Sequence, residues 1–510
     1  MNERARRPNW KEWPHLLPRV FVAALVLTTF VAYAASLPGP FLNWDDHWLV
    51  EENPFLARPL GEALAHMFFD LSRETRLQFG AEYLPVRDLA MWIDVHLWGA
   101  QPLALRITSL ATYLAAVVML RALLVRLFGA TWFCEVTALV FAIHPVHVES
   151  VAWIAGRKDV LALFFVCAAL AVHAGSSARR AWLVPVLVAL AVFSKSMSVA
   201  VLPLLVAQDY FQRKRPRWTT YGAVVGVCAV ALALHGYVGG VVGIYAGTLG
   251  GSRYRAFVTM GPVWLRYLGL SVMVGDLSLV EEVPVRASWD LLAVLGYGTL
   301  ALGLALAVLR ARRGERHWLL FWIWFVAPLL PVSQVFVPLQ NRMADRYLCF
   351  AVLGPVALGA WWATLALPRG GEHRFPWVAR LAAVALAAAS LGFLAATFSR
   401  ALLFTDSVLV FSEATRRTQT ATMAPYQLGK ALEASGQDAL ARIAFAEVLR
   451  RSPTGDDEAA RRATNNLAKL LARAGLHADA EVVLVKGLSR WPGDAKIAGN
   501  LAKLREMPSP

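Results

Sequence analysis

The stretch Phe141-Ala-Ile-His-Pro-Val-His-Val-Glu-Ser-Val-Ala-Trp-Ile-Ala-Gly-Arg-Lys-Asp159 lies between two long apolar segments of the chain. It places two histidines, a glutamate and an Arg-Lys-Asp cluster at the boundary between them. Ionisable side chains at a membrane boundary cost free energy, so a chain that keeps several there uses them for binding or chemistry. The stretch therefore predicts membrane-spanning helices with a polar site at their ends.

The composition supports this interpretation. The chain has 510 residues, of which 57% are hydrophobic, and its mean hydropathy is +0.50. A soluble protein of this size could not bury so much apolar surface. The net charge of +15 comes from basic residues that gather in short loops, which is typical of membrane orientation and argues against a nucleic-acid partner. The four cysteines lie in apolar segments without metal-type spacing, and we interpret them as packing residues.

The apolar runs predict an all-α polytopic membrane protein, because many of them approach the roughly 20 residues that cross a bilayer. The membrane domain occupies residues 1–400. We expect about eleven spans, namely 17–38, 103–128, 131–148, 159–174, 181–194, 196–211, 219–240, 289–310, 318–339, 343–366 and 377–398.

Basic loops set the predicted orientation. With these spans, the basic segments all fall on one side, which the positive-inside rule assigns to the cytoplasm. They are Arg4–Lys11, Arg121–Arg126, Arg179-Arg180, Arg213–Arg215, Arg310–Arg316 and Arg369–Arg374.

Two regions are then predicted on the external side. The first is loop 39–102, where apolar-polar mixtures at 58–69 and 84–98 indicate helices that lie along the membrane surface. The second is region 240–288. Its segment 257–275 is apolar enough to cross, but a crossing there would invert everything downstream, so we expect a re-entrant or interfacial piece.

The tail, residues 413–510, is polar, alanine-rich and periodic. The segment Tyr426–Gly436 matches Asn465–Gly475, and each is followed by a second helical pattern and a proline, Pro453 or Pro492. This helix, Gly turn, helix and Pro stop resembles tetratricopeptide repeats. It predicts a helical domain that binds a partner or substrate protein, with a plain helical hairpin domain as the alternative.

An acidic pair follows the first span, in Phe41-Leu-Asn-Trp-Asp-Asp-His47. Adjacent side chains of an extended segment point in opposite directions, so one of Asp45 and Asp46 can face a cavity while the other binds a metal or braces the loop. Burial beside aromatic rings would raise the pKa of a carboxyl group toward the range of a general base. The alternative is a turn that caps a surface helix.

His144, His147 and Glu149 form a second polar group. Their spacing does not match the His-Glu-x-x-His zinc pattern. We expect the group to orient a nucleophile, stabilise a leaving phosphate or shape the loop. A divalent metal ion held by Asp46, His144 and His147 is the weaker alternative.

Cationic side chains form the third group, because arginine and lysine are natural phosphate ligands. Arg342 and Arg346 are four residues apart, which would place them on one helical face. The alternative is that these cations snorkel to lipid headgroups. The charged residues predicted at external span ends are Arg157, Lys158, Asp159, Lys195, Arg342 and Arg346, with Tyr347 beside them.

Several of these motifs together resemble the TMTC family of transmembrane and tetratricopeptide-repeat O-mannosyltransferases. The likeness covers the membrane region and, more loosely, the tail. It rests on Asn43-Trp-Asp-Asp46, Asn53-Pro54, Leu84-Pro-Val-Arg87, Phe141 to Asp159, Phe193-Ser-Lys195 and Arg346-Tyr347. The chain departs from the family in its short repeat array and in Leu348, where a second aromatic residue is expected.

The resemblance implies a GT-C fold and a glycosyltransferase. Such an enzyme would move mannose from a polyprenyl-phosphate donor to Ser or Thr of a translocated protein, with inversion and no covalent intermediate. One of Asp45 and Asp46 would be the base or a metal-facing carboxylate, with Glu149 as a further catalytic candidate. Arg342 or Arg346 would hold the donor phosphate.

Two other interpretations compete with an enzyme. A non-catalytic membrane scaffold would not need the acidic pair and the cations together, and a transporter predicts charged residues near the middle of its spans. The short repeat array and the Ala/Arg-rich composition favour a bacterial inner membrane, with the site and the repeats in the periplasm. In a eukaryote both would face the lumen of the endoplasmic reticulum.

Overall fold

The computed structural model describes residues 17–175, 180–243, 247–272, 275–365, 376–454 and 457–506. The described residues form helices and connecting turns, and none of them is in a β-strand. The all-α prediction is therefore confirmed. The chain divides into two compact units. The first comprises Met1–Phe41, Asp45–Leu277 and Val283–Leu402, and the second comprises Leu42–Trp44, Ser278–Glu282 and Leu403–Pro510.

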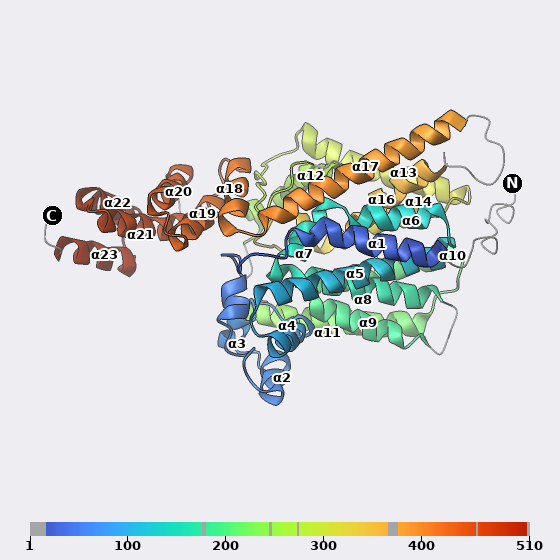
Figure 1. Cartoon of the computed structure of the whole chain (residues 1–510), viewed down its shortest axis with the longest axis horizontal. Helices are drawn as coiled ribbons and strands as arrows, with labels where there is room; N and C mark the ends of the chain where they lie inside the picture. The colour runs from blue at the N-terminus through green and yellow to red at the C-terminus, as the bar shows by residue number, and fades with distance from the viewer. Residues whose placement is uncertain are drawn as a thin grey trace. The chain divides into compact units, whose positions relative to one another are not determined.

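The first unit is a helical bundle in which α1, α5, α8 and α9 lie side by side (Figure 1). Each predicted span contains a helix. The bundle helices are α1 (Leu17–Ala34), α5 (Pro102–Phe128), α6 (Trp132–Ala142), α7 (Val148–Ala152), α8 (Arg157–Ala174), α9 (Leu183–Ser194), α10 (Val201–Gln212), α11 (Trp218–Val242), α12 (Arg253–Leu270), α13 (Leu291–Arg312), α14 (His317–Leu329), α15 (Leu348–Ala351), α16 (Leu353–Leu365) and α17 (Pro376–Leu403).

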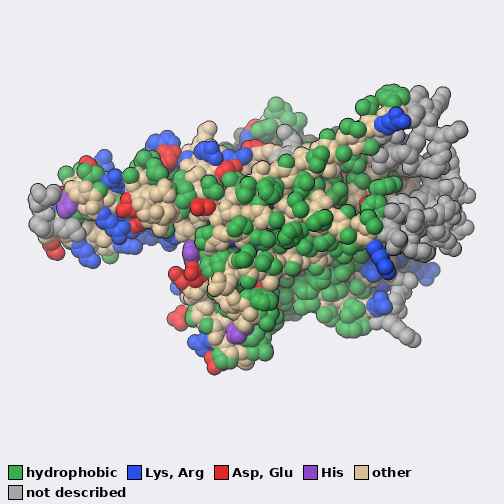
Figure 2. Space-filling model, in the orientation of Figure 1, with side chains coloured by type: hydrophobic (Ala, Val, Ile, Leu, Met, Phe, Trp, Pro, Cys, Tyr) green, Lys and Arg blue, Asp and Glu red, His purple; other side chains and the backbone are tan. Residues whose placement is uncertain are grey.

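Four of the described helices are long and apolar enough to cross a membrane by themselves: α5, α11, α13 and the 380–403 part of α17. The number rises to six when two bent helix pairs are each counted as one span. α1, α9 and α14 are shorter apolar helices. Apolar side chains cover the side of the bundle in Figure 2. The chain is an integral membrane protein.

Two predicted spans are broken instead of straight. In the range 131–148, α6 ends at Ala142, and the helical turns of Pro145–Ala152 continue at 46° to it. Proline lacks the N–H that would continue the helix, and its ring clashes with the preceding turn. In the range 343–366, Asp345–Ala351 meets Leu353–Leu365 at 54°. At the first break, the hydroxyls of Tyr33 and Tyr113 donate to the carbonyl oxygen of Ala142, and that of Thr397 donates to the carbonyl oxygen of Ile143.

α12 occupies most of segment 257–275, for which the sequence predicts a re-entrant or interfacial piece. It is not among the described helices that pass the apolarity test for a membrane crossing. It packs tightly on α13, since a Cβ atom at Gly296 would overlap the carbonyl oxygen of Gly261. A Cβ atom at Gly261 would in turn lie 2.7 Å from the Ala293 Cα atom. Small residues at such crossings let two helix backbones approach closely.

Replacing Gly296 by leucine should therefore separate α12 from α13. We expect a loss of roughly 1–3 kcal/mol in stability, the usual cost of overpacking. Thermal unfolding of the detergent-solubilised protein would measure it. Gly298→Leu is the matched control, because a Cβ atom at Gly298 meets nothing within 4 Å. Equal melting temperatures for the two variants would contradict this packing argument.

The predicted external loop 39–102 contains three helices. They are α2 (Leu60–Phe68), α3 (Arg73–Gln78) and α4 (Pro85–Trp98), of which α2 and α4 fall in the two ranges expected to be helical. Their faces include exposed apolar side chains, with Phe69 83% and Leu97 63% exposed. Exposed apolar side chains beside polar ones suit helices that lie in a membrane interface.

Basic loops are tied together at one end of the bundle, where Figure 2 shows Lys and Arg side chains. Arg126, near the end of α5, donates to the carbonyl oxygen of Ala171 at 2.9 Å. Arg217 donates to the carbonyl oxygen of Gly175 at 2.8 Å, and Arg316 to that of Tyr210 at 2.8 Å. These contacts join the ends of α5, α8, α10 and α14. The basic residues Arg4–Lys11, Arg179 and Arg369–Arg374 lie outside the described residues.

The second unit consists mainly of helix pairs. Its helices are α18 (Ser407–Arg417), α19 (Met423–Ala434), α20 (Asp438–Arg451), α21 (Glu458–Arg473), α22 (His477–Arg490) and α23 (Ala495–Glu506). Gly436 and Gly475 join the members of two pairs at φ of +74° and +77°, a backbone conformation that glycine adopts without strain. The two sequence units correspond to α19–α20 and α21–α22, and α23 follows them.

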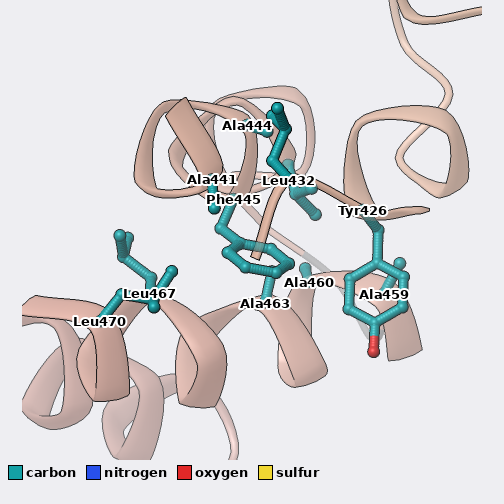
Figure 3. Close-up of a cluster of buried hydrophobic side chains, with 11 residues drawn as sticks. Tyr426, Leu432, Ala441, Ala444, Phe445, Ala459, Ala460, Ala463, Leu467 and Leu470 are labelled. Carbon is teal, nitrogen blue, oxygen red and sulfur yellow. The ribbon is translucent and has the colours of Figure 1, made fainter. Parts of the chain in front are cut away.

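An apolar core joins these pairs (Figure 3). The Phe445 ring of α20 lies directly over Gly429 of α19, where a Cβ atom would be 2.6 Å from the ring. Tyr426, Leu467 and Leu470 pack in the same cluster. The segment Leu42–Trp44 also belongs to this unit, and its Trp44 ring stacks on Phe411 with centroids 5.4 Å apart.

Candidate active site

Charged side chains gather in the first unit where α8 begins, at the opposite end of that helix from the basic loops. α8 starts at Arg157 and ends at Ala174, whose neighbour Gly175 receives a basic-loop hydrogen bond. The residues concerned come from the first loop, from the break after α6, from the α9–α10 connection and from the 3-10 turn Asp345–Tyr347 before α15. The two broken spans therefore bring distant polar segments to one place.

Asp45 and Asp46 lie in a turn that leads into the helical turn His47–Glu51. The prediction of an extended segment is wrong, because Asp46 has helical angles of φ −62° and ψ −39°. The two carboxylates still have different surroundings. Asp46 is fully buried, and its Oδ1 accepts the backbone N–H of Ala155 at 3.0 Å. Asp46 therefore anchors this turn to the 3-10 segment Ile154–Gly156.

Asp45 is only half-buried and has an acid-base environment suited to proton transfer. Burial raises the pKa of its carboxyl group to about 6, while the nearby cations Lys158 and Arg346 act in the opposite direction. The side chain of Trp48 also hydrogen-bonds to this carboxylate. At neutral pH the group is mostly ionised yet holds a proton more readily than an ordinary aspartate, which suits a general base.

Glu82 is a member of this site that the sequence analysis missed. Its Oε2 lies 2.5 Å from Lys158 Nζ and 3.2 Å from Arg87 Nη1. Burial by itself would raise the pKa of Glu82, but Lys158 and Arg87 outweigh it and hold the pKa below its usual value. The signal that could have found Glu82 is its position just before Leu84-Pro-Val-Arg87.

Arg346 is held from several sides in the 3-10 turn Asp345–Tyr347 that leads into α15. Its guanidinium forms an ion pair with Glu149, and its backbone N–H donates to Glu149 Oε2 at 3.2 Å. The guanidinium carbon lies 5.7 Å from the Trp153 ring centroid and 5.6 Å from that of Tyr347. Both hydrogen-bonded oxygens of Glu149 thus face Arg346. Glu149 therefore contacts both the guanidinium and the backbone N–H of Arg346, and its predicted catalytic role stays a prediction.

Lys195 lines a mostly apolar cleft. The residue forms an ion pair with Asp159, and its Nζ lies 5.7 Å from the centroid of the Tyr347 ring. All three side chains line a small cleft of about 50 Å³. The cleft is otherwise mostly apolar and runs along α8 and α10, past residues such as Val166 and Leu204.

Arg157 does not belong to this group of cations. It forms an ion pair with Asp94, and its Nε donates to Ser109 Oγ at 3.1 Å. Its Nη2 donates to the carbonyl oxygen of Leu105 at 2.6 Å. Since these protein groups surround the buried guanidinium, Arg157 serves as a structural link between α8, α4 and α5. The prediction that it binds a donor phosphate is not supported.

Arg342 also lies apart from the cations described above. Residues 341–344 are not helical, so the prediction that Arg342 and Arg346 share a helical face is wrong. Arg342 is exposed and donates to the carbonyl oxygen of Val283 at 2.9 Å. Arg346, in contrast, lies within the 3-10 turn Asp345–Tyr347 and is buried.

The two histidines are packed within the fold. His144 Nε2 lies 3.2 Å from the carbonyl oxygen of Ser271, and His147 Nε2 lies 2.9 Å from that of Cys349. Both rings are fully buried. Among the described residues no group of three or more His, Cys, Asp or Glu side chains could hold a metal ion, so the geometry does not support a site at Asp46, His144 and His147.

Fold and site together define an integral membrane protein with a charged site at one end of a helical bundle and a tail of helix pairs. Its sequence is similar to protein O-mannosyl-transferases. It is 22% identical to one from Caenorhabditis elegans over 339 residues, which covers 64% of this chain and 48% of that protein. It is 32% identical to mouse TMTC1 over 161 residues, 31% of this chain and 17% of that protein.

A third relative, human TMTC4, is 30% identical over 173 residues, which covers 30% of this chain and 23% of that protein. The resemblance to TMTC-type proteins is therefore confirmed, although the chain spans about half or less of the length of these relatives. No family model matches the chain. Among solved structures, an oligosaccharyltransferase of Archaeoglobus fulgidus with a tethered acceptor peptide aligns over 77% of this chain and 56% of its own, with 14% identity and a TM-score of 0.42.

Proposed function

We propose that this protein is a GT-C-type glycosyltransferase that moves mannose from a polyprenyl-phosphate donor to a Ser or Thr hydroxyl of a translocated protein. The observation that carries the proposal is the position of Asp45. Burial raises the pKa of this half-buried carboxyl group to about 6, and the charges of Lys158 and Arg346 act on it. A proton acceptor next to cations is the arrangement that deprotonating an alcohol and releasing a phosphate requires. The choice of mannose follows the names of the relatives.

In the proposed reaction, the Asp45 carboxylate takes the proton of the acceptor hydroxyl. The oxygen then attacks the anomeric carbon of the sugar, and the bond between that carbon and the phosphate oxygen breaks. The polyprenyl phosphate leaves with the electron pair of that bond. A single displacement inverts the anomeric configuration and needs no covalent intermediate. Asp45 holds the proton at the end of the step.

Lys158, Lys195 and Arg346 are the proposed ligands of the donor phosphate. Their charges stabilise the negative charge that grows on the phosphate as it departs. The small cleft lined by Lys195 and Tyr347 is the proposed position of the carrier carbon atoms next to the phosphate, because its lining places a cation beside apolar side chains. Glu149 and Asp159 position Arg346 and Lys195, respectively.

The basic loops support one orientation in the membrane. If these lie in the cytoplasm, the site faces the periplasm of a bacterium or the lumen of the endoplasmic reticulum. Acceptor proteins emerge unfolded on that side, and the helix pairs of the tail would bind them.

Transfer can be tested in membranes from cells with and without this protein. Radiolabelled polyprenyl-phosphate mannose is added, and label is measured in protein before and after β-elimination, which releases O-linked sugars. Label that appears only with the protein and is released by β-elimination supports the proposal. Equal labelling in both membranes, or label that resists β-elimination, contradicts it.

The pH dependence provides a further prediction. Because Asp45 has a pKa of about 6, its base form is lost as the pH falls through that value. We expect kcat/KM for transfer to fall about tenfold per pH unit below pH 6 and to level off above pH 7. A phosphodiester donor has no group that titrates in this range. A rate that stays constant from pH 7 to pH 5 would rule out Asp45 as the base.

A further inference from the structure

Two basic segments of the first unit meet at the end of the bundle opposite the proposed active site. Segment 209–217 runs from the last turn of α10 to the start of α11, and segment 310–316 runs from the last turn of α13 to the start of α14. Each segment holds four arginine or lysine residues and a single carboxylate, Asp209 or Glu315. The positive charge of this end therefore exceeds what the carboxylates of the two segments can balance.

The carbonyl oxygen of Tyr210 joins the two segments. It accepts the backbone N–H of Arg213 at 3.3 Å and the guanidinium of Arg316 at 2.8 Å. The same guanidinium lies over the Tyr210 ring, with its carbon atom 4.6 Å from the ring centroid. These contacts hold the α13–α14 turn against the end of α10, so the two groups of cations lie next to each other.

Protein groups already contact both carboxylates. Asp209 is buried, its Oδ1 lies 3.0 Å from His173 Nε2, and its Oδ2 accepts the hydroxyl of Tyr221 at 2.6 Å. Glu315 lies 3.2 Å from the guanidinium of Arg310. Both carboxylates are therefore hydrogen-bonded or ion-paired within the fold.

The basic side chains divide into those that bind the protein and those that face outward. Lys214 and Arg217 donate to backbone carbonyl oxygens at the end of α8. Arg215, Arg312 and Arg313 are exposed, and in the part of the chain that the structure describes no group is paired with their guanidiniums. The contacts of the other cations thus fix a scaffold on which three positive charges are available to a partner.

These three arginines flank helices that can cross a membrane. Arg215 shortly precedes α11, and Arg312 is the last residue of α13; each of these helices is long and apolar enough to span a bilayer by itself. Trp218, the first residue of α11, is 75% exposed, and tryptophan is enriched at the membrane–water interface. The arginines therefore lie at the level of the lipid headgroups, where anionic phosphates are within reach.

We infer that Arg215, Arg312 and Arg313 bind the phosphate groups of anionic phospholipids in the leaflet at this end of the bundle. A guanidinium can donate two parallel N–H bonds to a phosphate, and the carbon atoms of the arginine side chain can lie along apolar surface. Such a site would hold the ends of α11 and α13 at one depth in the membrane. The inference does not rest on the proposed function.

Native mass spectrometry of the full-length protein, released from an uncharged detergent, can count bound phosphatidylglycerol and phosphatidylcholine with the same acyl chains. We expect the protein to prefer phosphatidylglycerol. Changing Arg215, Arg312 and Arg313 together to glutamine should weaken its binding about a hundredfold, since each cation near the headgroups contributes roughly fivefold. Changing the same three residues to lysine should keep most of the preference, because the charges remain.

The matched control changes Arg58, Arg73 and Arg253 to glutamine, which removes the same charge from exposed side chains of loop 39–102 and of α12. This variant should bind lipid like the unchanged protein. Equal losses in the two glutamine variants would show attraction to the net charge and overturn the inference. Equal binding of the two lipids by the unchanged protein would also overturn it. So would displacement of the lipid by an equal concentration of glycerol phosphate, which would make a free phosphate the ligand. None of these outcomes depends on sugar transfer.

Discussion

Replacing Asp45 by asparagine is expected to lower the rate of sugar transfer roughly 10²- to 10⁴-fold, the usual contribution of a positioned general base. Asparagine has nearly the same shape but cannot accept the proton. The change removes one negative charge beside Lys158 and Arg346, so the donor phosphate should bind at least as tightly as before. A fall in kcat with an unchanged or lower KM for the donor is therefore the expected pattern. Initial rates at several donor concentrations would measure it.

Asp46→Asn is the matched control for this prediction. Asparagine keeps an Oδ1 atom that can accept the N–H of Ala155, so the anchoring of the turn should survive. We expect this variant to keep most of its activity and to melt slightly earlier. Normal activity in both variants would mean that this loop carries no chemistry. Loss of activity in Asp46→Asn alone would move the role of base to the buried carboxylate.

Much of the architecture follows from the sequence because lipid imposes simple rules. Each apolar run predicted a helix, since only hydrogen-bonded backbone is tolerated in a bilayer. The helices of the tail were equally readable, because Gly436 and Gly475 recur between periodic apolar positions. The apolar helices and the helix pairs of the tail can both be predicted because each depends on residues that are neighbours in the chain.

The site was less predictable because it depends on where helices break and on which side chains pair across the fold. An unbroken helix through 343–366 would place Arg342 and Arg346 on one face, but the chain becomes helical only from Asp345 onward. Glu149 and Arg346 are far apart in the chain, and nothing local indicates their ion pair. Burial separates the structural cations from those available to a substrate. A single sequence does not reveal that the Arg157 guanidinium is buried.

The adjacent cations Arg157 and Lys158 are therefore expected to respond in opposite ways to the same substitution. Arg157→Gln should destabilise the protein by roughly 3–5 kcal/mol, because it leaves the Asp94 carboxylate buried without its cation. It also removes the hydrogen bonds that join α8 to Ser109 and Leu105 of α5. The melting temperature in detergent and the yield of folded protein should both fall sharply.

Lys158→Gln should instead leave the fold almost intact. Its partner Glu82 is partly exposed and keeps Arg87 as a second cation, so no buried charge is stranded. Its expected defect is in transfer, since Lys158 lies beside Asp45 and the proposed phosphate position. If Arg157→Gln remained folded and lost only donor binding, Arg157 would be a substrate ligand after all. If Lys158→Gln melted as early as Arg157→Gln, the distinction between a structural and a functional cation would fail at this pair.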